Sequence, residues 1–175
     1  MNDDAISRAA RIRLMIFDVD GILTDGSLHY GPDGESIKTF NVLDGHGIKL
    51  LLQSGVTIAI ISARKSDIVA KRAADLGIAH LFQGVHDKRT AFEQLLATTG
   101  AEVDACGYVG DDVIDLPILM RVGFAASVPN GHAEVRSRVH YVTQASGGRG
   151  PARELCDFIL RAQGNYEAAI ASYLQ

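Results

Sequence analysis

The chain has 175 residues, 47% of them hydrophobic, and a formal net charge of −4 at pH 7. This length and composition predict one domain with a full hydrophobic core and exclude a disordered chain. Because a mildly acidic chain offers no basic surface, we expect neither nucleic acid nor a membrane as a partner.

The amino-terminal segment, residues 1–13, has no apolar core of the kind that a signal peptide needs. No apolar run in the chain is long enough to span a bilayer, so the sequence predicts a cytoplasmic protein. The two cysteines, Cys106 and Cys156, lie far apart in apolar surroundings and are predicted to be buried free thiols.

Short apolar runs alternate with segments of helical periodicity from residue 13 onward. The runs are typical of buried strands and lie at 13–17, 56–61, 105–109, 123–128 and 139–142. The helical segments each end in a glycine and lie at 44–55, 63–77, 88–100 and 112–123, with one more short strand before residue 88. Alternating strands and helices predict an α/β fold with a doubly wound, mainly parallel sheet.

Two segments interrupt this alternation. Residues 25–40 contain a Gly-Pro-Asp-Gly turn between two short apolar stretches and predict a β-hairpin inserted before the first of these helices. A lone two-stranded hairpin is not stable, so we expect other subunits to bury Leu28, Tyr30, Ile37 and Phe40. Residues 146–175 are predicted to form a flexible Ser-Gly-Gly-Arg-Gly loop and a helical C-terminal tail. The whole chain, 1–175, is predicted to be a single domain.

Three polar clusters directly follow predicted strands, and they are Asp18 with Asp20, Ser62 with Arg64, and Asp111 with Asp112. In open parallel sheets, ligands bind beyond the carboxyl ends of the strands, so these groups are predicted to converge. Clustered carboxylates raise one another's pKa or require a cation between them, and oxygen ligands without cysteine or paired histidines favour Mg²⁺ as that cation. Magnesium sites of this kind bind substrate phosphate, for which Ser62 and Lys88 are candidate ligands.

Each cluster taken alone has a simpler explanation. Asp18 and Asp20 could lie in a solvated turn, and Asp111-Asp112 could cap a helix. Ser62 could likewise be a helix cap, and Lys88 a surface lysine. Only the joint pattern favours a catalytic site over these alternatives.

The order of these motifs resembles that of the haloacid dehalogenase superfamily of aspartate-nucleophile phosphotransferases. The matching stretches are "DVDGILTDG", "IISAR", Lys88 in "HDKRTAF", and "GDDVID". Over residues 12–166 the chain also resembles the family of 3-deoxy-D-manno-octulosonate 8-phosphate phosphatases, in "FNVLDGHGIKLL", "YVGDDVIDLPIL", "HYVTQASGGRGPARELCDFIL" and "RAQGNY". Departures from the pattern are Ser62 in "SAR", where Thr-Gly-Arg is common, and Leu43, where arginine is common.

The resemblance implies a Rossmann-like fold without a cap domain, Mg²⁺ dependence and a phosphorylated sugar acid as substrate, in lipopolysaccharide inner-core synthesis. It also implies a homotetramer in which the hairpin builds a central barrel and helps to complete the neighbour's active site. Two alternatives stay open. One is a phosphatase for a nine-carbon ulosonic acid phosphate, and the other is a non-catalytic oligomerisation module of the same fold.

Roles for individual residues follow from this resemblance. Asp18 would be the nucleophile and Asp20 the general acid and base, while Ser62 and Lys88 would bind phosphoryl oxygens. Mg²⁺ would be held by the Asp18 carboxylate, the Asp20 main-chain carbonyl and Asp111. Outside this ligand set, Asp112 and Asp115 would orient waters and Lys88. The predicted substrate-binding residues are Lys38, Asn41, Asp44, Arg64 and Arg149, the last reaching a neighbouring subunit's pocket.

Overall fold

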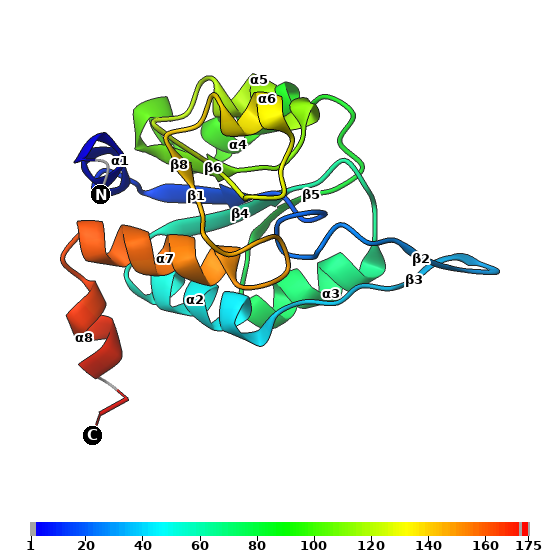
Figure 1. Ribbon diagram of the computed structural model, residues 1–175, viewed down its shortest axis with the longest axis horizontal. Helices are drawn as coiled ribbons and strands as arrows, with labels where there is room; N and C mark the ends of the chain where they lie inside the picture. The colour runs from blue at the N-terminus through cyan, green and yellow to red at the C-terminus, as the bar shows by residue number, and fades with distance from the viewer. Residues whose placement is uncertain (1–2, 172, 175) are drawn as a thin grey trace.

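The computed structural model describes residues 3–171, 173 and 174. A six-stranded sheet in the order β5-β4-β1-β6-β7-β8 forms its centre (Figure 1). The strands are β1 (Leu14–Phe17), β4 (Thr57–Ile61), β5 (His80–Phe82), β6 (Cys106–Val109), β7 (Phe124–Ser127) and β8 (Tyr141–Val142). Every neighbouring pair in this sheet is parallel, so the predicted α/β class with a mainly parallel sheet is confirmed.

Helices cover both faces of the sheet (Figure 1). One face packs against α1 (Asp3–Ala9), α2 (Val42–Gln53), α3 (Asp67–Leu76) and α7 (Pro151–Ala162). The other packs against α4 (Lys88–Thr99), α5 (Leu116–Leu119) and α6 (Ala133–Arg136). Because both faces are covered, β1 is buried throughout: Met15 and Phe17 join one core, and Leu14 and Ile16 the other.

Two predicted helical regions are shorter than the periodicity indicates. The segment 112–123 forms a 3₁₀ turn (Val113–Asp115) and then the four-residue α5, because the Asp115 side chain accepts hydrogen bonds from the backbone and folds the chain back. The C-terminal region breaks at Gly164, whose φ is +72°, into α7 and α8 (Tyr166–Ala171). No helix in the described part of the chain has the length and apolarity needed to cross a bilayer. Cys106 and Cys156 are buried free thiols, as predicted.

The insert between β1 and α2 is a small antiparallel hairpin of β2 (His29–Gly31) and β3 (Gly34–Ile37). It projects away from the sheet and helices (Figure 1). Its apolar side chains lie open to solvent: Leu28, Tyr30 and Ile37 are 42%, 64% and 56% exposed. Within a single chain, these apolar side chains of the hairpin are therefore left exposed to solvent.

The Ser-Gly-Gly-Arg-Gly loop, predicted to be flexible, packs against the turn that follows β1. The backbone N–H of Gly148 donates to the carbonyl of Ile22 at 2.9 Å, and that of Gly147 donates to Asn130 Oδ1 at 3.0 Å. A Cβ at position 147 would lie 1.8 Å from the Gly21 carbonyl oxygen, so only glycine allows this approach. Beyond the loop, α7 has six buried residues and belongs to the core rather than to a tail.

Candidate active site

Three neighbouring strands deliver the central polar groups. Asp18 follows β1, Ser62 follows β4 and Asp111 follows β6 after Gly110. The order β4-β1-β6 places these strand ends side by side. The chain builds outward from β1 to β4 and β5 and then returns to β6 on the other side, so β1 and β6 flank the switch point where ligands bind in such sheets.

A cleft of about 220 Å³ opens at this edge. It is lined by Asp18, Asp20, Gly26, Ser62, Ala63, Arg64, Lys88, Asp111, Asp112 and Ile114. Seven of these are residues that the sequence singled out, from four separate parts of the chain. The predicted convergence of carboxylates, hydroxyl and lysine is thus present in one subunit.

Lys88 lies between two carboxylates at the floor of the cleft and is only 3% exposed. Its Nζ is 2.9 Å from Asp18 Oδ1 and 2.6 Å from Asp115 Oδ1, and it donates to the Tyr108 hydroxyl at 3.2 Å. Lys88 is the first residue of α4, and its positive charge there is unfavourable because the N-terminus is the positive end of the helix dipole. Burial lowers the pKa of Lys88, but Asp18 and Asp115 outweigh that effect and hold it above its usual value. Lys88 is therefore a buried ammonium ion, not a surface lysine.

Asp115 is completely buried and has both of its oxygens occupied. Oδ1 accepts from Lys88 and from the Tyr108 hydroxyl, at 2.6 Å in each case. Oδ2 accepts from the backbone N–H groups of Asp111 and Asp112, both at 3.1 Å. Asp115 therefore orients Lys88 and the loop after β6.

Asp18 and Asp111 are the candidate carboxylate ligands for a cation. Asp18, Asp111 and Asp115 each offer an oxygen within 4.8 Å of the others. Burial, followed by repulsion from Asp115, raises the pKa of Asp18 to about 7. The same causes, with Asp112 in addition, raise the pKa of Asp111 to about 7. One lysine among three close carboxylates leaves excess negative charge, so this hard oxygen donor set fits Mg²⁺.

Gly21 allows the turn after β1 to lie against Asp111. Its φ is +87°, and a Cβ at this position would lie 2.1 Å from Asp111 Oδ2. A side chain here would strain the backbone and would displace either the turn or the Asp111 carboxylate, so the position favours glycine. The glycine of the first sequence motif thus positions the strand end against the fourth motif.

Asp20 lies at the mouth of the cleft, where it contacts two cations. Lys38 Nζ donates a hydrogen bond to Asp20 Oδ1. Arg64 Nε lies 4.0 Å from Asp20 Oδ2, and the Arg64 guanidinium also donates to the Tyr30 hydroxyl at 2.7 Å. Lys38 also pairs with Glu35 Oε1 at 2.9 Å. The predicted sugar contact by Lys38 does not fit this placement, since its Nζ is held by two carboxylates and its side chain is 1% exposed.

Ser62 lines the cleft, but not as a helix N-terminal residue. Helix α3 begins at Asp67 with Ser66 as its cap, so Ser62 lies four residues before the cap. Its Oγ accepts a hydrogen bond from the Arg64 backbone N–H at 3.3 Å. The phosphate-binding role predicted for Ser62 therefore depends on its hydroxyl and the following loop, not on the α3 dipole.

Asn41 and Asp44 lie in a different place, at the start of α2. Asn41 caps this helix by accepting from the Leu43 N–H at 2.8 Å. Asp44 is 2% exposed and accepts from the Arg153 N–H at the start of α7 at 2.8 Å. The predicted sugar-binding role of Asp44 does not fit, because the carboxylate is buried between two helices of its own subunit and the substrate has no access to it.

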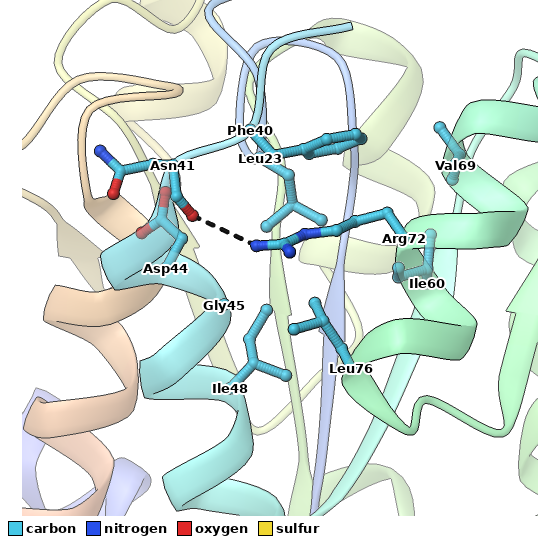
Figure 2. Close-up of a pocket in the computed structure, with 10 residues that line it drawn as sticks. All are labelled: Leu23, Phe40, Asn41, Asp44, Gly45, Ile48, Ile60, Val69, Arg72 and Leu76. Carbon is cyan, nitrogen blue, oxygen red and sulfur yellow. Dashed lines mark hydrogen bonds between the residues drawn. The ribbon is translucent and has the colours of Figure 1, made fainter.

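Figure 2 shows the small pocket that Asn41 and Asp44 line. Arg72 reaches from α3 beneath Phe40 and donates to the Asn41 carbonyl oxygen at 3.4 Å. Gly45 makes room for it, since a Cβ there would lie 2.3 Å from the guanidinium. The cavity is about 10 Å³, which is space for roughly one water molecule and not for a sugar phosphate. This pocket is a packing feature that joins α2 to α3.

Arg149 and Asp112 are exposed at the rim. The positive charge of Arg149 helps to hold the pKa of Asp25 below its usual value, after the larger effect of hydrogen bonds from Ser27. Arg149 therefore lies beside the turn that borders the cleft, without lining the cleft itself. Asp112 accepts from the Val113 N–H at 2.7 Å and caps the 3₁₀ turn. For Asp112 the simpler explanation, a helix cap, describes its contacts.

Three residues of the site were missed in the sequence. Tyr108 is completely buried, and burial raises its pKa well above the usual value while its hydroxyl bonds Lys88 and Asp115. A tyrosine in an otherwise apolar buried strand needs a partner for its hydroxyl, and that signal was available in "CGYVGDD". Tyr30 and Glu35 also reach the site, but the hairpin gives no such signal.

Comparisons with known proteins agree with this geometry. The family model described as haloacid dehalogenase-like hydrolase matches residues 74–154. The chain is 47% identical over 167 residues to 3-deoxy-D-manno-octulosonate 8-phosphate phosphatase KdsC from Yersinia pestis, covering 95% of this chain and 89% of that protein.

Two solved structures are similar over nearly the whole chain. One is a 3-deoxy-D-manno-octulosonate 8-phosphate phosphatase from Moraxella catarrhalis in complex with magnesium ion, phosphate ion and KDO, with 44% identity, a TM-score of 0.95 and 99% coverage of both chains. The other is the cobalt-bound form of the corresponding Haemophilus influenzae phosphatase, with 39% identity and a TM-score of 0.92, covering 96% of this chain and 99% of that one.

Proposed function

The chain belongs to the haloacid dehalogenase-like hydrolases, in the family of 3-deoxy-D-manno-octulosonate 8-phosphate phosphatases, and on this premise we propose its reaction and the roles of its residues. The protein is a phosphoric monoester hydrolase that converts 3-deoxy-D-manno-octulosonate 8-phosphate and water to 3-deoxy-D-manno-octulosonate and phosphate. One observation carries the assignment of roles: Asp18, Asp111, Lys88 and Asp20 share one cleft at the switch point of the sheet.

Magnesium is the metal that this donor set fits. We place Asp18, Asp111 and the Asp20 main-chain carbonyl as its protein ligands. When bound, the ion neutralises charge on the nucleophile and on the substrate phosphate, so that one anion can approach another. Asp115 is not a ligand in this proposal, because its oxygens already accept four hydrogen bonds.

In the first step the Asp18 carboxylate attacks phosphorus in line, and the bond between phosphorus and the sugar oxygen breaks. Asp20 donates its proton to the leaving sugar oxygen, which would otherwise depart as an alkoxide. Lys88 and Ser62 hold the phosphoryl oxygens in place and stabilise their charge. The products of this step are the free sugar acid and an aspartyl phosphate on Asp18.

In the second step the ionised Asp20 takes a proton from a water molecule, which attacks the phosphorus of the aspartyl phosphate. The bond to Asp18 breaks and inorganic phosphate leaves. Asp20 ends protonated and Asp18 ends ionised, which restores the starting state. A single residue could not be both nucleophile and proton donor in the first step, which is why two carboxylates are needed.

A phosphate-release screen tests the proposed substrate. With Mg²⁺ present, we expect the eight-carbon sugar acid phosphate to give the highest kcat/KM, at least tenfold above a nine-carbon ulosonic acid phosphate and simple hexose phosphates. Leu43, 56% exposed at the start of α2, is the reason to include the nine-carbon compound. A higher kcat/KM for that compound would reassign the substrate, and release from none of them would support a non-catalytic module.

Stability should depend on pH and Mg²⁺ together. A carboxyl group whose pKa is higher in the folded chain stabilises the fold below its unfolded pKa near 3.8 and loses that contribution as pH rises through about 7. In EDTA we therefore expect Tm to fall between about pH 5 and pH 8. Because Mg²⁺ offsets the ionised carboxylates, its addition should raise Tm by several degrees more at pH 8 than at pH 5.

The Asp111→Asn variant is the control for this measurement. Removing one carboxylate should flatten the fall of Tm in EDTA and reduce the stabilisation by Mg²⁺. The same Mg²⁺ effect at both pH values, or an undiminished effect in Asp111→Asn, would contradict the assigned ligands. Differential scanning fluorimetry on the whole chain is sufficient.

The assembly is a further part of the proposal. We propose a homotetramer in which the hairpins of the subunits pack together and cover Leu28, Tyr30 and Ile37. The exposed apolar side chains on a projecting two-stranded ribbon support this arrangement, since such a ribbon has no core of its own. Arg149, exposed beside the cleft, is then a candidate to contact substrate held by a neighbouring subunit.

Charged residues on the hairpin should break the assembly. We expect Leu28→Lys with Ile37→Lys to yield a smaller species by sedimentation velocity and at least a tenfold lower kcat/KM for the sugar phosphate. The control is Met120→Lys, at a side chain that is 60% exposed elsewhere on the surface. Unchanged sedimentation of the hairpin variant would remove the hairpin from the interface.

A further inference from the structure

Lys38 links the hairpin to the cleft. It directly follows β3, and its side chain folds inward until only 1% of it is exposed. A buried ammonium group is stable only when paired, and one of the two carboxylates that pair with Lys38 is Asp20, through Oδ1. Since Asp20 lines the cleft beside Asp18, this contact reaches the reacting groups directly.

Other hairpin residues complete a network around the same carboxylate. Glu35 Oε1 lies 2.9 Å from Lys38 Nζ and 3.9 Å from the Arg64 guanidinium. Arg64 Nε is buried, makes no hydrogen bond within the described part of the chain, and lies 4.0 Å from Asp20 Oδ2. Tyr30 holds the other end of Arg64 at 2.7 Å. Among the described residues, the two oxygens of Asp20 therefore differ in their contacts: Oδ1 accepts a hydrogen bond from Lys38, whereas Oδ2 has only the Arg64 cation at 4.0 Å.

We propose that Lys38 is a positioning residue, which fixes Asp20 through Oδ1 so that Oδ2 carries the proton to the leaving oxygen and later takes one from water. This inference rests on the proposed function, because it assigns a support for the general acid and base of that reaction. It also gives the hairpin a second role within its own subunit, in addition to the contact between subunits.

Geometry favours this role over a direct sugar contact. Proton transfer requires the acid oxygen to lie within hydrogen-bond reach of the leaving oxygen, about 2.6–3.2 Å. Asp20 lies in a turn, and its side chain is 21% exposed, so without an anchor the carboxylate could rotate away from the cleft. A substrate hydroxyl could bind Lys38 only by displacing Glu35 or Asp20 from a side chain that solvent does not reach.

The test compares two substrates that differ in their need for an acid. A sugar phosphate releases an alkoxide and needs a proton in the first step, whereas p-nitrophenyl phosphate releases a stable phenolate and does not. Both need the base in the second step. The variants are Lys38→Met, which keeps most of the length of the side chain and loses the charge, and Lys38→Arg, which keeps the charge. Lys49→Met, on the exposed face of α2, is the matched control.

For Lys38→Met we expect kcat for the sugar phosphate to fall by roughly 10²- to 10³-fold, within the range of general acid–base catalysis, with KM changed by less than about threefold. With p-nitrophenyl phosphate, rapid-quench kinetics should show a burst of about one nitrophenolate per site followed by slow turnover. Lys38→Arg should recover at least part of the loss. Lys49→Met should match the parent.

A double-mutant cycle of Lys38→Met with Asp20→Asn tests the inference even if Lys38→Met is less stable than the parent. If Lys38 acts through Asp20, adding Lys38→Met to Asp20→Asn should cost less than threefold in kcat. A raised KM at unchanged kcat would make Lys38 a sugar ligand and overturn the inference. Equal losses for both substrates without a burst, or additive losses in the cycle, would also overturn it. An inactive parent on every sugar phosphate would defeat the proposed substrate alone, because the burst is measured on p-nitrophenyl phosphate.

Discussion

Asp18→Asn is expected to lower kcat by roughly 10⁶-fold. This is the size of loss seen when a covalent nucleophile is removed from an enzyme that depends on it. The amide has the same shape but cannot attack phosphorus as an anion. The fold should survive, because burial and Asp115 already make the charge of Asp18 unfavourable and raise its pKa to about 7. Without Mg²⁺, the variant should therefore have a Tm at least equal to that of the parent at pH 8.

Phosphate release, Tm and intact-mass detection of the phosphoenzyme measure this outcome together. The control is Asp75→Asn, an exposed carboxyl in the last turn of α3, which should leave all three unchanged. Activity of Asp18→Asn within a hundredfold of the parent would remove the covalent step from the mechanism. A large fall in its Tm would show that the side chain is structural.

The strands could be predicted because burial on both faces leaves a simple pattern. The run at 13–17 has no polar residue between Leu14 and Phe17, as expected for a central parallel strand, and β1 begins and ends within a residue of it. The helix predicted over 112–123 was wrong for a local reason. The apolar residues have helical spacing, but the Asp115 side chain accepts hydrogen bonds from the backbone before it, and only four residues are left for α5.

Much of the site was also predictable, because the carboxyl ends of adjacent parallel strands meet at one edge. The sequence placed Asp18, Ser62 and Asp111 there once the strands were assigned, and Lys88 joined them at the first turn of α4. The helix cap for Asp112 and the cation site were both open alternatives. In the structure Asp112 caps the 3₁₀ turn, whereas its neighbour Asp111 lines the cleft and stays the proposed metal ligand.

Long-range contacts account for what the sequence could not predict. Asp44 follows the hairpin in sequence, which predicts a sugar ligand, but its carboxylate accepts from the Arg153 N–H, 109 positions along the chain. The partner of Lys38 could not be predicted either, since nothing in "GESIKTF" indicates that its ammonium group contacts Asp20. Both are buried charges, and the partner of a buried charge is set by tertiary packing.

Lys88→Met is expected to have the largest effect on stability. It leaves Asp18, Asp115 and the Tyr108 hydroxyl without their shared donor in a site that solvent barely reaches. Breaking a buried ion pair by removing one partner costs about 3–5 kcal/mol, so we expect a loss of that order in the free energy of unfolding at pH 8. Activity should fall by at least 10²-fold, since a positioned charge on the phosphoryl oxygens is also lost.

The pH dependence separates this effect from simple loss of packing. With a pKa of about 7, Asp18 is already neutral at pH 5 and pairs with Lys88 as a carboxylate only at higher pH; because Lys88 lowers that pKa, its removal raises it further. Urea unfolding should therefore show a smaller loss at pH 5 than at pH 8. Arg89→Met, which removes an exposed pair with Glu93 at 2.8 Å, should have a much smaller effect at either pH, because solvent screens this pair. A loss for Lys88→Met that is equal at both pH values, or as small as that of the control, would mean that Lys88 does not balance the carboxylates.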